Sequence, residues 1–145
     1  LGPIIEEVSV IAPPLVQLRG NRWRCAQPAD LPPVAADPRR AFQILLNLVS
    51  NAAKYTTQGE ITLTAARVGD EVHVTVRDTG VGIAEPRLAD LFEPFAQVQA
   101  DDQQRPGLGL GLALSQRWAR LMEGRIEVES SEGKGSTFRL CLPRT

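Results

Sequence analysis

The chain has 145 residues, a formal net charge of −1, and 43% apolar against 23% charged residues, the balance of an ordinary globular domain. This charge gives no whole-chain attraction to nucleic acid or anionic membrane, and no apolar run approaches the roughly 18 residues that a membrane span needs. Cys25 and Cys141 are too few and too far apart to suggest a disulfide scaffold or a zinc site. We therefore expect residues 1–145 to form one soluble, cytoplasmic domain of a larger protein, and the sequence leaves open whether that parent is anchored in a membrane.

The first half of the chain is predicted to contain a helix, a strand and a second helix. Residues 1–20 are a candidate helical lead-in, but Pro13 and Pro14 are expected to break or kink any helix over 4–12. Residues 22–27 are predicted to be a strand. Asp37 and Pro38 combine an N-cap carboxylate with proline at the first helical position, so a helix is expected from there to about Lys54.

The second half is predicted to be richer in strands. Strands over 60–68 and 71–78 are joined by a two-residue turn at Gly69-Asp70, and a short helix is expected over 86–91. A polar loop at 100–106 precedes a helix whose Leu114, Trp118, Leu121 and Met122 recur at core spacing. A closing hairpin is expected from strands over 125–130 and 136–142. This order predicts an α/β two-layer sandwich, with a mixed, mostly antiparallel sheet and helices packed on one face.

A polar stripe runs along the predicted helix over residues 38–54. Gln43, Asn47, Asn51 and Lys54 are spaced by four, four and three residues, which places them on one helical face. Polar groups buried along such an edge need partners. Amide oxygens suit a hard cation such as Mg²⁺, and a lysine suits a phosphate.

Three glycine-containing segments follow the stripe, and each alone is ambiguous. Asp78-Thr79-Gly80-Val81-Gly82-Ile83 follows a predicted strand and is either a ring-amine acceptor with close backbone access or a surface turn. Gly107-Leu108-Gly109-Leu110-Gly111 opens a helix and is either a phosphate site or a close-packed helix start. The segment from Gly133 to Phe138 is either a hairpin turn or a place where Thr137 enters the site.

In order and spacing these segments resemble the N, G1, F, G2 and G3 boxes of the catalytic and ATP-binding domain of sensor histidine kinases. That domain shares the Bergerat fold with DNA gyrase B, the Hsp90 chaperone and MutL. The resemblance covers residues 30–143, and Phe92-Glu93-Pro94-Phe95 supplies the F box. Five ordered boxes are more specific than any single glycine motif.

The resemblance implies a role for each matching residue in holding ATP and Mg²⁺. It implies that Asn51 ligates Mg²⁺, that Asn47 and Lys54 hold metal or phosphate, and that Tyr55 lies near the adenine or ribose. It also implies that Asp78 binds the exocyclic amine of adenine, in a pocket shaped by Gly80, Gly82 and Ile83, with Thr137 nearby through water. Gly107, Gly109, Gly111 and Leu112 would form the hinge of an ATP lid over 96–108. Arg105 in that lid is either a γ-phosphate contact or a solvated surface arginine.

The same resemblance separates phosphate transfer from hydrolysis. The hydrolytic members carry a glutamate four residues before the metal-binding asparagine, and an aspartate at the position of Lys54. Here the first position is Asn47, which cannot accept a proton at neutral pH. Both differences favour a kinase that transfers the γ-phosphate to an outside nucleophile.

That nucleophile is expected to lie outside this chain. His73 is the only histidine, lies mid-strand and is followed by Val74, whereas the family's phosphoacceptor is a helical histidine followed by an acidic residue. The implied partners are the parent's dimerisation and histidine phosphotransfer domain and a response regulator receiver domain. We expect the isolated domain to be a monomer and to contact neither nucleic acid nor membrane.

Three alternatives use the same fold: a nucleotide-binding scaffold without catalysis, an ATPase, and a serine kinase of the anti-sigma type. Two departures from the family pattern keep the scaffold in consideration. The lid is short and ends in Arg105-Pro106-Gly107, and Leu108 replaces a small polar residue.

Overall fold

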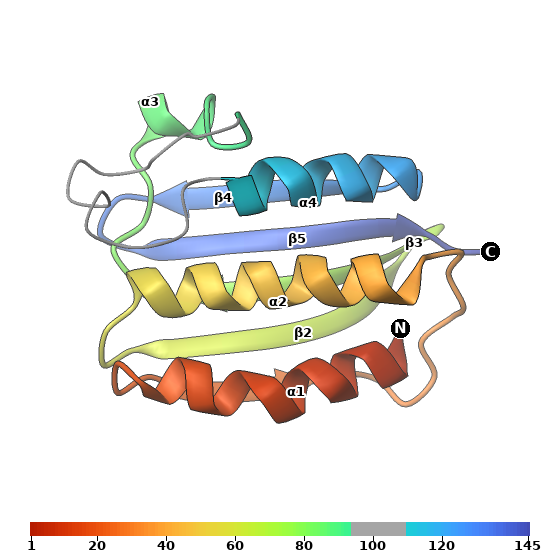
Figure 1. The fold of residues 1–145 in the computed structure, drawn as a ribbon, viewed down its shortest axis with the longest axis horizontal. Helices are drawn as coiled ribbons and strands as arrows, with labels where there is room; N and C mark the ends of the chain where they lie inside the picture. The colour runs from red at the N-terminus through yellow and green to blue at the C-terminus, as the bar shows by residue number, and fades with distance from the viewer. Residues whose placement is uncertain (94–109) are drawn as a thin grey trace.

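Five strands form one mixed sheet in the order β1-β2-β3-β5-β4 in the computed structural model, which describes residues 1–93 and 110–145. The strands are β1 (Arg22–Ala26), β2 (Glu60–Val68), β3 (Glu71–Asp78), β4 (Arg125–Ser131) and β5 (Gly135–Pro143). β1 pairs in parallel with β2, and the other neighbours are antiparallel. α1, α2 and α4 lie side by side on one face of the sheet (Figure 1), which confirms the predicted two-layer architecture.

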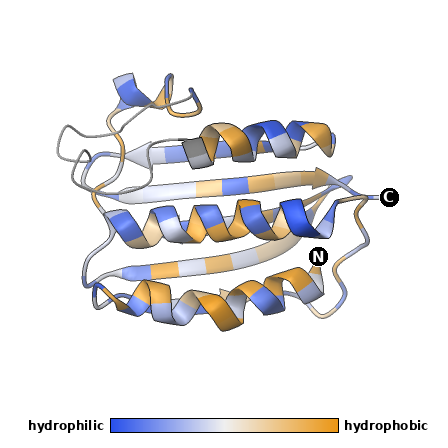
Figure 2. Cartoon of the chain, viewed as in Figure 1, coloured by the Kyte–Doolittle hydropathy of each residue, from blue (hydrophilic) through white to orange (hydrophobic). Residues whose placement is uncertain are grey.

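The central helix, α2 (Pro38–Tyr55), begins and ends close to the predicted positions. The carboxylate of Asp37 accepts hydrogen bonds from the backbone N–H groups of Arg39 and Arg40, at 2.9 and 3.3 Å. These bonds satisfy donors that have no partner inside the helix. Apolar and polar segments alternate along the helix (Figure 2), as expected when one face packs on the sheet.

The first helix corrects the prediction. α1 (Gly2–Gln17) runs without interruption through Pro13 and Pro14, although each proline removes one backbone hydrogen bond. Its inward residues Ile5, Val8, Ala12 and Val16 are fully buried at spacings of three and four. The burial of this apolar stripe against the core therefore offsets the lost hydrogen bonds near the end of the helix.

The β2–β3 hairpin agrees with the prediction at every boundary. Gly69 adopts a positive φ of 61° in the two-residue turn, a conformation that glycine accepts readily. Val72, Val74 and Val76 are buried beneath the helices. The intervening residues, His73 among them, lie on the other face of the sheet, because side chains alternate along a strand.

Two other predicted helices need correction. α3 spans only Glu85–Leu88, where a helix over 86–91 was expected. α4 (Leu110–Leu121) lies where expected, but Leu114 and Leu121 are 42% and 64% exposed, whereas Ser115 and Gln116 are buried. Among residues 1–93 and 110–145, none of the helices combines the length and apolar character needed to cross a membrane.

Candidate functional site

A narrow pocket lies between the C-terminal half of α2, the end of β3 and the start of β5. Its walls are formed by Asn51, Tyr55, Asp78, Gly82, Ile83, Ser136 and Phe138. Five of these seven residues are among those expected to bind a nucleotide. The other two, Ser136 and Phe138, come from β5, which pairs with β3 at this edge.

Asp78 is the buried carboxylate of this pocket, with 4% of its surface exposed. Its Oδ1 accepts a hydrogen bond from the backbone N–H of Gly80 at 2.9 Å. Burial raises the pKa of Asp78 above its ordinary value, and the backbone N–H groups of Gly80 and Ser136 act in the opposite direction. The carboxylate therefore lies in a desolvated place, where a ligand N–H group would be a favourable partner.

Thr56 adds a second polar group to the same region. The residue is 1% exposed, and its hydroxyl oxygen has no hydrogen-bond partner of good geometry among the described residues. The hydroxyl is nevertheless close enough to Asp78 to lower the pKa of that carboxyl. A buried hydroxyl without a partner is costly, so a ligand or a water molecule at this place would stabilise it.

The two glycines after Asp78 allow close backbone packing around the pocket. A Cβ on Gly80 would lie 2.2 Å from the carbonyl oxygen of Tyr55, so only glycine fits beside the end of α2. Gly82 has a φ of 71°, and a Cβ there would lie 2.0 Å from the carbonyl oxygen of Ser131. The segment is thus held closely between α2 and the β4–β5 turn.

The register of β3 and β5 contradicts the predicted place of Thr137. Asp78 pairs with Ser136, and Thr137 pairs with Arg77. Directly paired residues share a face of the sheet, so Ser136 lies beside Asp78 and Thr137 lies on the opposite face. The prediction was wrong by one residue, because the sequence does not reveal which of two adjacent hydroxyl residues faces inward.

The polar stripe of α2 extends from this pocket toward α4. The side-chain amide of Asn47 donates a hydrogen bond to the hydroxyl of Ser115 at 3.0 Å, and Asn51 lies in the pocket wall. The ammonium of Lys54 is 6.0 Å from the centre of the Tyr55 ring. The structure therefore brings Asn51, Tyr55 and Asp78 together, and connects Asn47 to the helix that follows the glycine segment.

Several predicted residues lie outside the described residues: Arg105, Gly107, Gly109 and the lid over 96–108. The described part of that segment begins at the start of α4. A Cβ on Gly111 would lie 3.7 Å from the amide of Asn47, an ordinary contact distance. Leu112 is buried at 7% exposure in the core beside the site.

Three polar residues of this region were missed by the sequence analysis: Thr56, Ser115 and Ser136. Each is a small hydroxyl residue at an inward position of an otherwise apolar surface. For Ser115 a signal was available, because it lies four residues after Gly111 and therefore on the same helical face. No comparable periodic signal marks Thr56, which directly follows α2.

The geometry agrees with a known domain family. Residues 36–145 match the model of the "Histidine kinase-, DNA gyrase B-, and HSP90-like ATPase" family. The chain belongs to this family. The family resemblance expected from the sequence is confirmed, and so is the Bergerat fold, since the structural neighbours are histidine kinase catalytic domains.

The curated relatives of this family member are named sensory kinases. It is 41% identical over 143 residues to the adaptive-response sensory kinase SasA of Synechococcus sp. (strain JA-3-3Ab), covering 97% of this chain and 37% of SasA. It is 46% identical over 110 residues to the circadian input-output histidine kinase CikA of Synechococcus elongatus, covering 74% of this chain and 15% of CikA. The chain thus spans little more than a third, or less, of the length of these relatives.

Solved structures that resemble this chain are also histidine kinases. Full-length ShkA in complex with AMPPNP superimposes with a TM-score of 0.85 at 33% identity, over 99% of this chain and 30% of ShkA. The nucleotide-free catalytic domain of the histidine kinase ThkA superimposes with a TM-score of 0.84 at 28% identity, over 100% of this chain and 93% of that domain.

Proposed function

We propose that this domain binds ATP with Mg²⁺ and donates the γ-phosphate to a histidine on a separate phosphoacceptor domain, in a two-component signalling pathway. The family match and the kinase names of the relatives support this activity. The likeness to ShkA, which was solved with AMPPNP, supports ATP as the ligand.

The observation that carries the choice of transfer over hydrolysis is the composition of α2. The helix contains no aspartate or glutamate over its whole length, from Pro38 to Tyr55. Hydrolysis needs a base that accepts a proton from the attacking water, and an asparagine amide cannot serve as one. With Asn47 hydrogen-bonded to Ser115, the helix positions phosphate for an outside nucleophile and does not activate water.

The adenine end of the nucleotide would be recognised by Asp78. An ionised carboxylate only accepts hydrogen bonds, and the exocyclic amine of adenine donates them. The buried Thr56 hydroxyl lies close to Asp78 and adds a second polar group beside the carboxylate. These features support the assignment of Asp78, Tyr55, Gly80, Gly82 and Ile83 to the base.

The donor set on α2 fits magnesium. Mg²⁺ prefers oxygen ligands, and the side-chain oxygen of Asn51 is one in the pocket wall. The bond from Asn47 to Ser115 uses the amide nitrogen of Asn47 and not its oxygen. A magnesium ion held there would neutralise charge on the triphosphate, and Lys54 would hold phosphate beside it.

The phosphoacceptor is proposed to be on another domain because His73 is remote from the pocket. His73 is on the face of the sheet opposite to α2 and hydrogen-bonds Glu71 at 2.7 Å. In the parent protein the donor would therefore serve the dimerisation and phosphotransfer domain, and the phosphate would continue to a receiver domain.

The test places this chain inside a known histidine kinase. The chain replaces the matching segment of SasA from Synechococcus sp. (strain JA-3-3Ab), an alignment of 143 residues that covers 97% of this chain, and the chimera is incubated with γ-labelled ATP and Mg²⁺. We expect phosphate that is labile to acid and stable to base, as on histidine, and no label on the isolated chain. Asn51→Ala in the chimera is the matched control and should remove the label.

The alternatives give different results in this assay. Acid-stable label would indicate a serine kinase. Nucleotide binding without any label, in a chimera that is folded, would indicate a binding scaffold. Release of inorganic phosphate from the isolated chain, at a rate abolished by Asn51→Ala, would indicate an ATPase. Each of these results would contradict the proposed transfer to histidine.

A further inference from the structure

Three potential metal ligands meet on the open face of the sheet, away from the nucleotide pocket. Glu71, His73 and Cys141 each present one ligand atom, and these atoms all lie within 4.8 Å of one another. Glu71 and His73 are two residues apart on β3, and His73 pairs directly with Cys141 on β5. The sheet itself therefore brings the three side chains to one face, as alternation along a strand requires.

The ligand types favour zinc over the magnesium used at the nucleotide site. Thiolate, imidazole and carboxylate are the ligands that zinc accepts in proteins, whereas magnesium selects oxygen ligands. Zinc bonds of about 2.0–2.3 Å place the ligand atoms of a tetrahedral site about 3.3–3.8 Å apart. The present ligand atoms, all within 4.8 Å of one another, are near that spacing.

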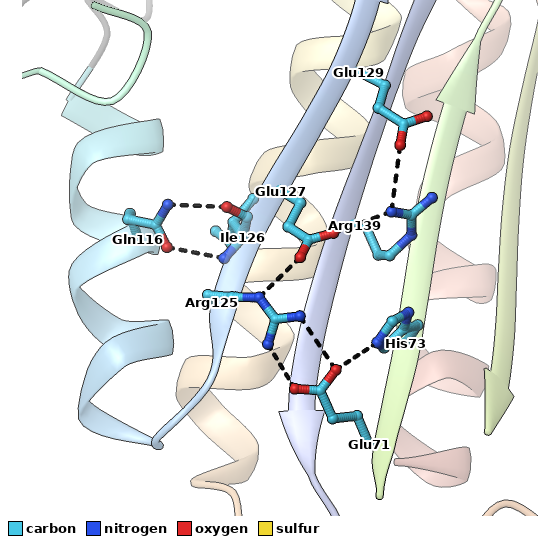
Figure 3. A network of polar contacts seen from close by, with 8 residues as sticks. All are labelled: Glu71, His73, Gln116, Arg125, Ile126, Glu127, Glu129 and Arg139. Carbon is cyan, nitrogen blue, oxygen red and sulfur yellow. Dashed lines mark hydrogen bonds and ion pairs between the residues drawn. The ribbon is translucent and has the colours of Figure 1, made fainter. Parts of the chain in front are cut away.

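One cation already occupies part of this place. The guanidinium of Arg125 hydrogen-bonds both oxygens of Glu71, and its Nε donates to Glu127 at 2.8 Å (Figure 3). Arg125 also hydrogen-bonds Glu127. If Glu71 moved away to bind a metal, the Arg125 guanidinium would therefore keep one partner. Glu127 in turn accepts a hydrogen bond from Arg139 at 3.1 Å.

Charged groups surround the cluster on the outer face. The three carboxylates in Figure 3 are Glu71, Glu127 and Glu129, and the two guanidinium groups are Arg125 and Arg139. Arg77 lies on the same face beside Thr137, which also pairs with Glu129, so these charged groups balance before Cys141 loses its proton. A divalent ion would offset the charge of the thiolate that forms on binding.

We propose that Glu71, His73 and Cys141 bind one zinc ion on the outer face of the sheet, with solvent as the fourth ligand. On binding, the thiol of Cys141 forms a bond to zinc and releases its proton to solvent, and Glu71 exchanges Arg125 for the metal. The two cysteines of the chain are too far apart in sequence to predict a zinc site. In the folded sheet, however, Cys141 on β5 lies beside His73 and Glu71 on β3.

Cobalt(II) is the probe, because a bond from thiolate to cobalt gives a charge-transfer band that oxygen and nitrogen ligands do not give. The 145-residue chain is titrated with Co²⁺ in the absence of nucleotide. We expect a band that reaches its limit at one ion per chain, is lost when Zn²⁺ is added, and is unaffected by excess Mg²⁺. Absence of the band would overturn the proposal.

The variants identify the ligands. His73→Gln and Cys141→Ala should each lower cobalt affinity at least tenfold, on the order of the loss seen when a metal ligand or its support is removed. Cys25→Ser is the matched control, since Cys25 is the chain's other cysteine and is exposed, and it should retain the band. An unchanged cobalt affinity in His73→Gln, or loss of the band in Cys25→Ser, would overturn the site.

Arg125→Ala gives the sharpest result, because it removes the competing cation and no proposed ligand. We expect cobalt to bind about tenfold more tightly, since the carboxylate of Glu71 no longer has to exchange partners. A purely structural role of the cluster predicts a less stable chain with no gain in metal affinity. Weaker cobalt binding in this variant would overturn the assignment of Glu71 as a ligand.

Discussion

Asp78 and Glu71 lie at opposite ends of β3 and on opposite faces of the sheet, and their pKa values move in opposite directions. Burial raises the pKa of Asp78, which has hydrogen-bond donors but no ion-pair partner among the residues that the structure describes. The guanidinium of Arg125 and the ring of His73 lower the pKa of Glu71 to about 2. One strand therefore carries a desolvated carboxylate at one end and a paired carboxylate at the other.

The difference indicates what each face is built to do. A buried carboxylate without a cation weakens the fold at neutral pH, and such groups are typical of sites that await a ligand. The paired carboxylate of Glu71 strengthens the sheet, and a metal must compete with Arg125 to reach it. The inner face thus presents an unpaired carboxylate to a ligand, whereas on the outer face a ligand has to displace Arg125 from Glu71.

The largest expected effect on stability comes from Gly80→Ala, which tests the close packing of Gly80 against the end of α2. The new Cβ would meet the backbone of Tyr55, which cannot rotate away as a side chain could. We expect a loss of about 3 kcal/mol in the free energy of unfolding, the upper end of overpacking costs. Urea denaturation measures it. Gly111→Ala is the matched control, because a Cβ at that position makes only ordinary contacts, and equal losses in both variants would contradict the close packing at Gly80.

Asp78→Asn is the next change, and it should separate binding from stability. The amide lacks the acceptor strength of a carboxylate, so nucleotide affinity should fall roughly 10–100-fold, as for a hydrogen bond to a charged group. The same change removes a charge that burial disfavours, so the nucleotide-free chain should become more stable at neutral pH. Calorimetric titration and urea denaturation measure the two effects.

The control for this variant is Asp70→Asn, at an aspartate whose side chain is 97% exposed in the β2–β3 turn. It should alter neither affinity nor stability appreciably. The raised pKa of Asp78 adds a pH effect: the carboxylate takes up a proton at a higher pH than a free one does, so nucleotide binding should weaken as pH falls through the raised value. Loss of stability in Asp78→Asn at neutral pH would contradict the comparison between the two carboxylates.

Much of the fold was predictable because local signals and packing agree. The cap at Asp37, the turn at Gly69-Asp70 and the alternation in β3 all lie where the sequence places them. α1 was misjudged because tertiary packing outweighs the local cost of Pro13 and Pro14. The free energy gained by burying the apolar stripe of α1 opposes the cost of the two prolines, and the sequence alone does not show which is larger.

The site was predictable where chemistry depends on residue type, and less so where it depends on register. Asn51 and Asp78 carry distinctive groups at distinctive spacings, whereas Ser136 and Thr137 differ only in which face they occupy. In α4 the inward positions hold Ser115 and Gln116, whose partners are on other elements. Gln116 hydrogen-bonds both backbone groups of Ile126 on the edge strand β4, a contact that no apolar pattern reveals.

Asn51→Ala makes a smaller change on the inner face, and its effect should depend on the metal. An amide oxygen bound to magnesium contributes only when magnesium is present, so nucleotide affinity should fall about tenfold with Mg²⁺ and little without it. Asp78→Asn should instead weaken binding in either condition. Titrations with and without Mg²⁺ compare the two, and equal losses in both variants regardless of metal would contradict the roles assigned to them.

The smallest effect is expected on the outer face, from Glu71→Gln. The pKa of Glu71 is about 2 in the fold and near 4.5 in an unfolded chain, so the carboxylate stabilises the fold above pH 4.5 and ceases to do so as pH falls toward 2. The wild-type free energy of unfolding should decline across that interval more steeply than that of Glu71→Gln. The difference should be modest, because this carboxylate is partly exposed and its ion pair is screened by solvent. Glu132→Gln, in the exposed β4–β5 turn, should retain the wild-type slope, and a Glu71→Gln profile parallel to wild type would show that the outer network adds nothing to the fold.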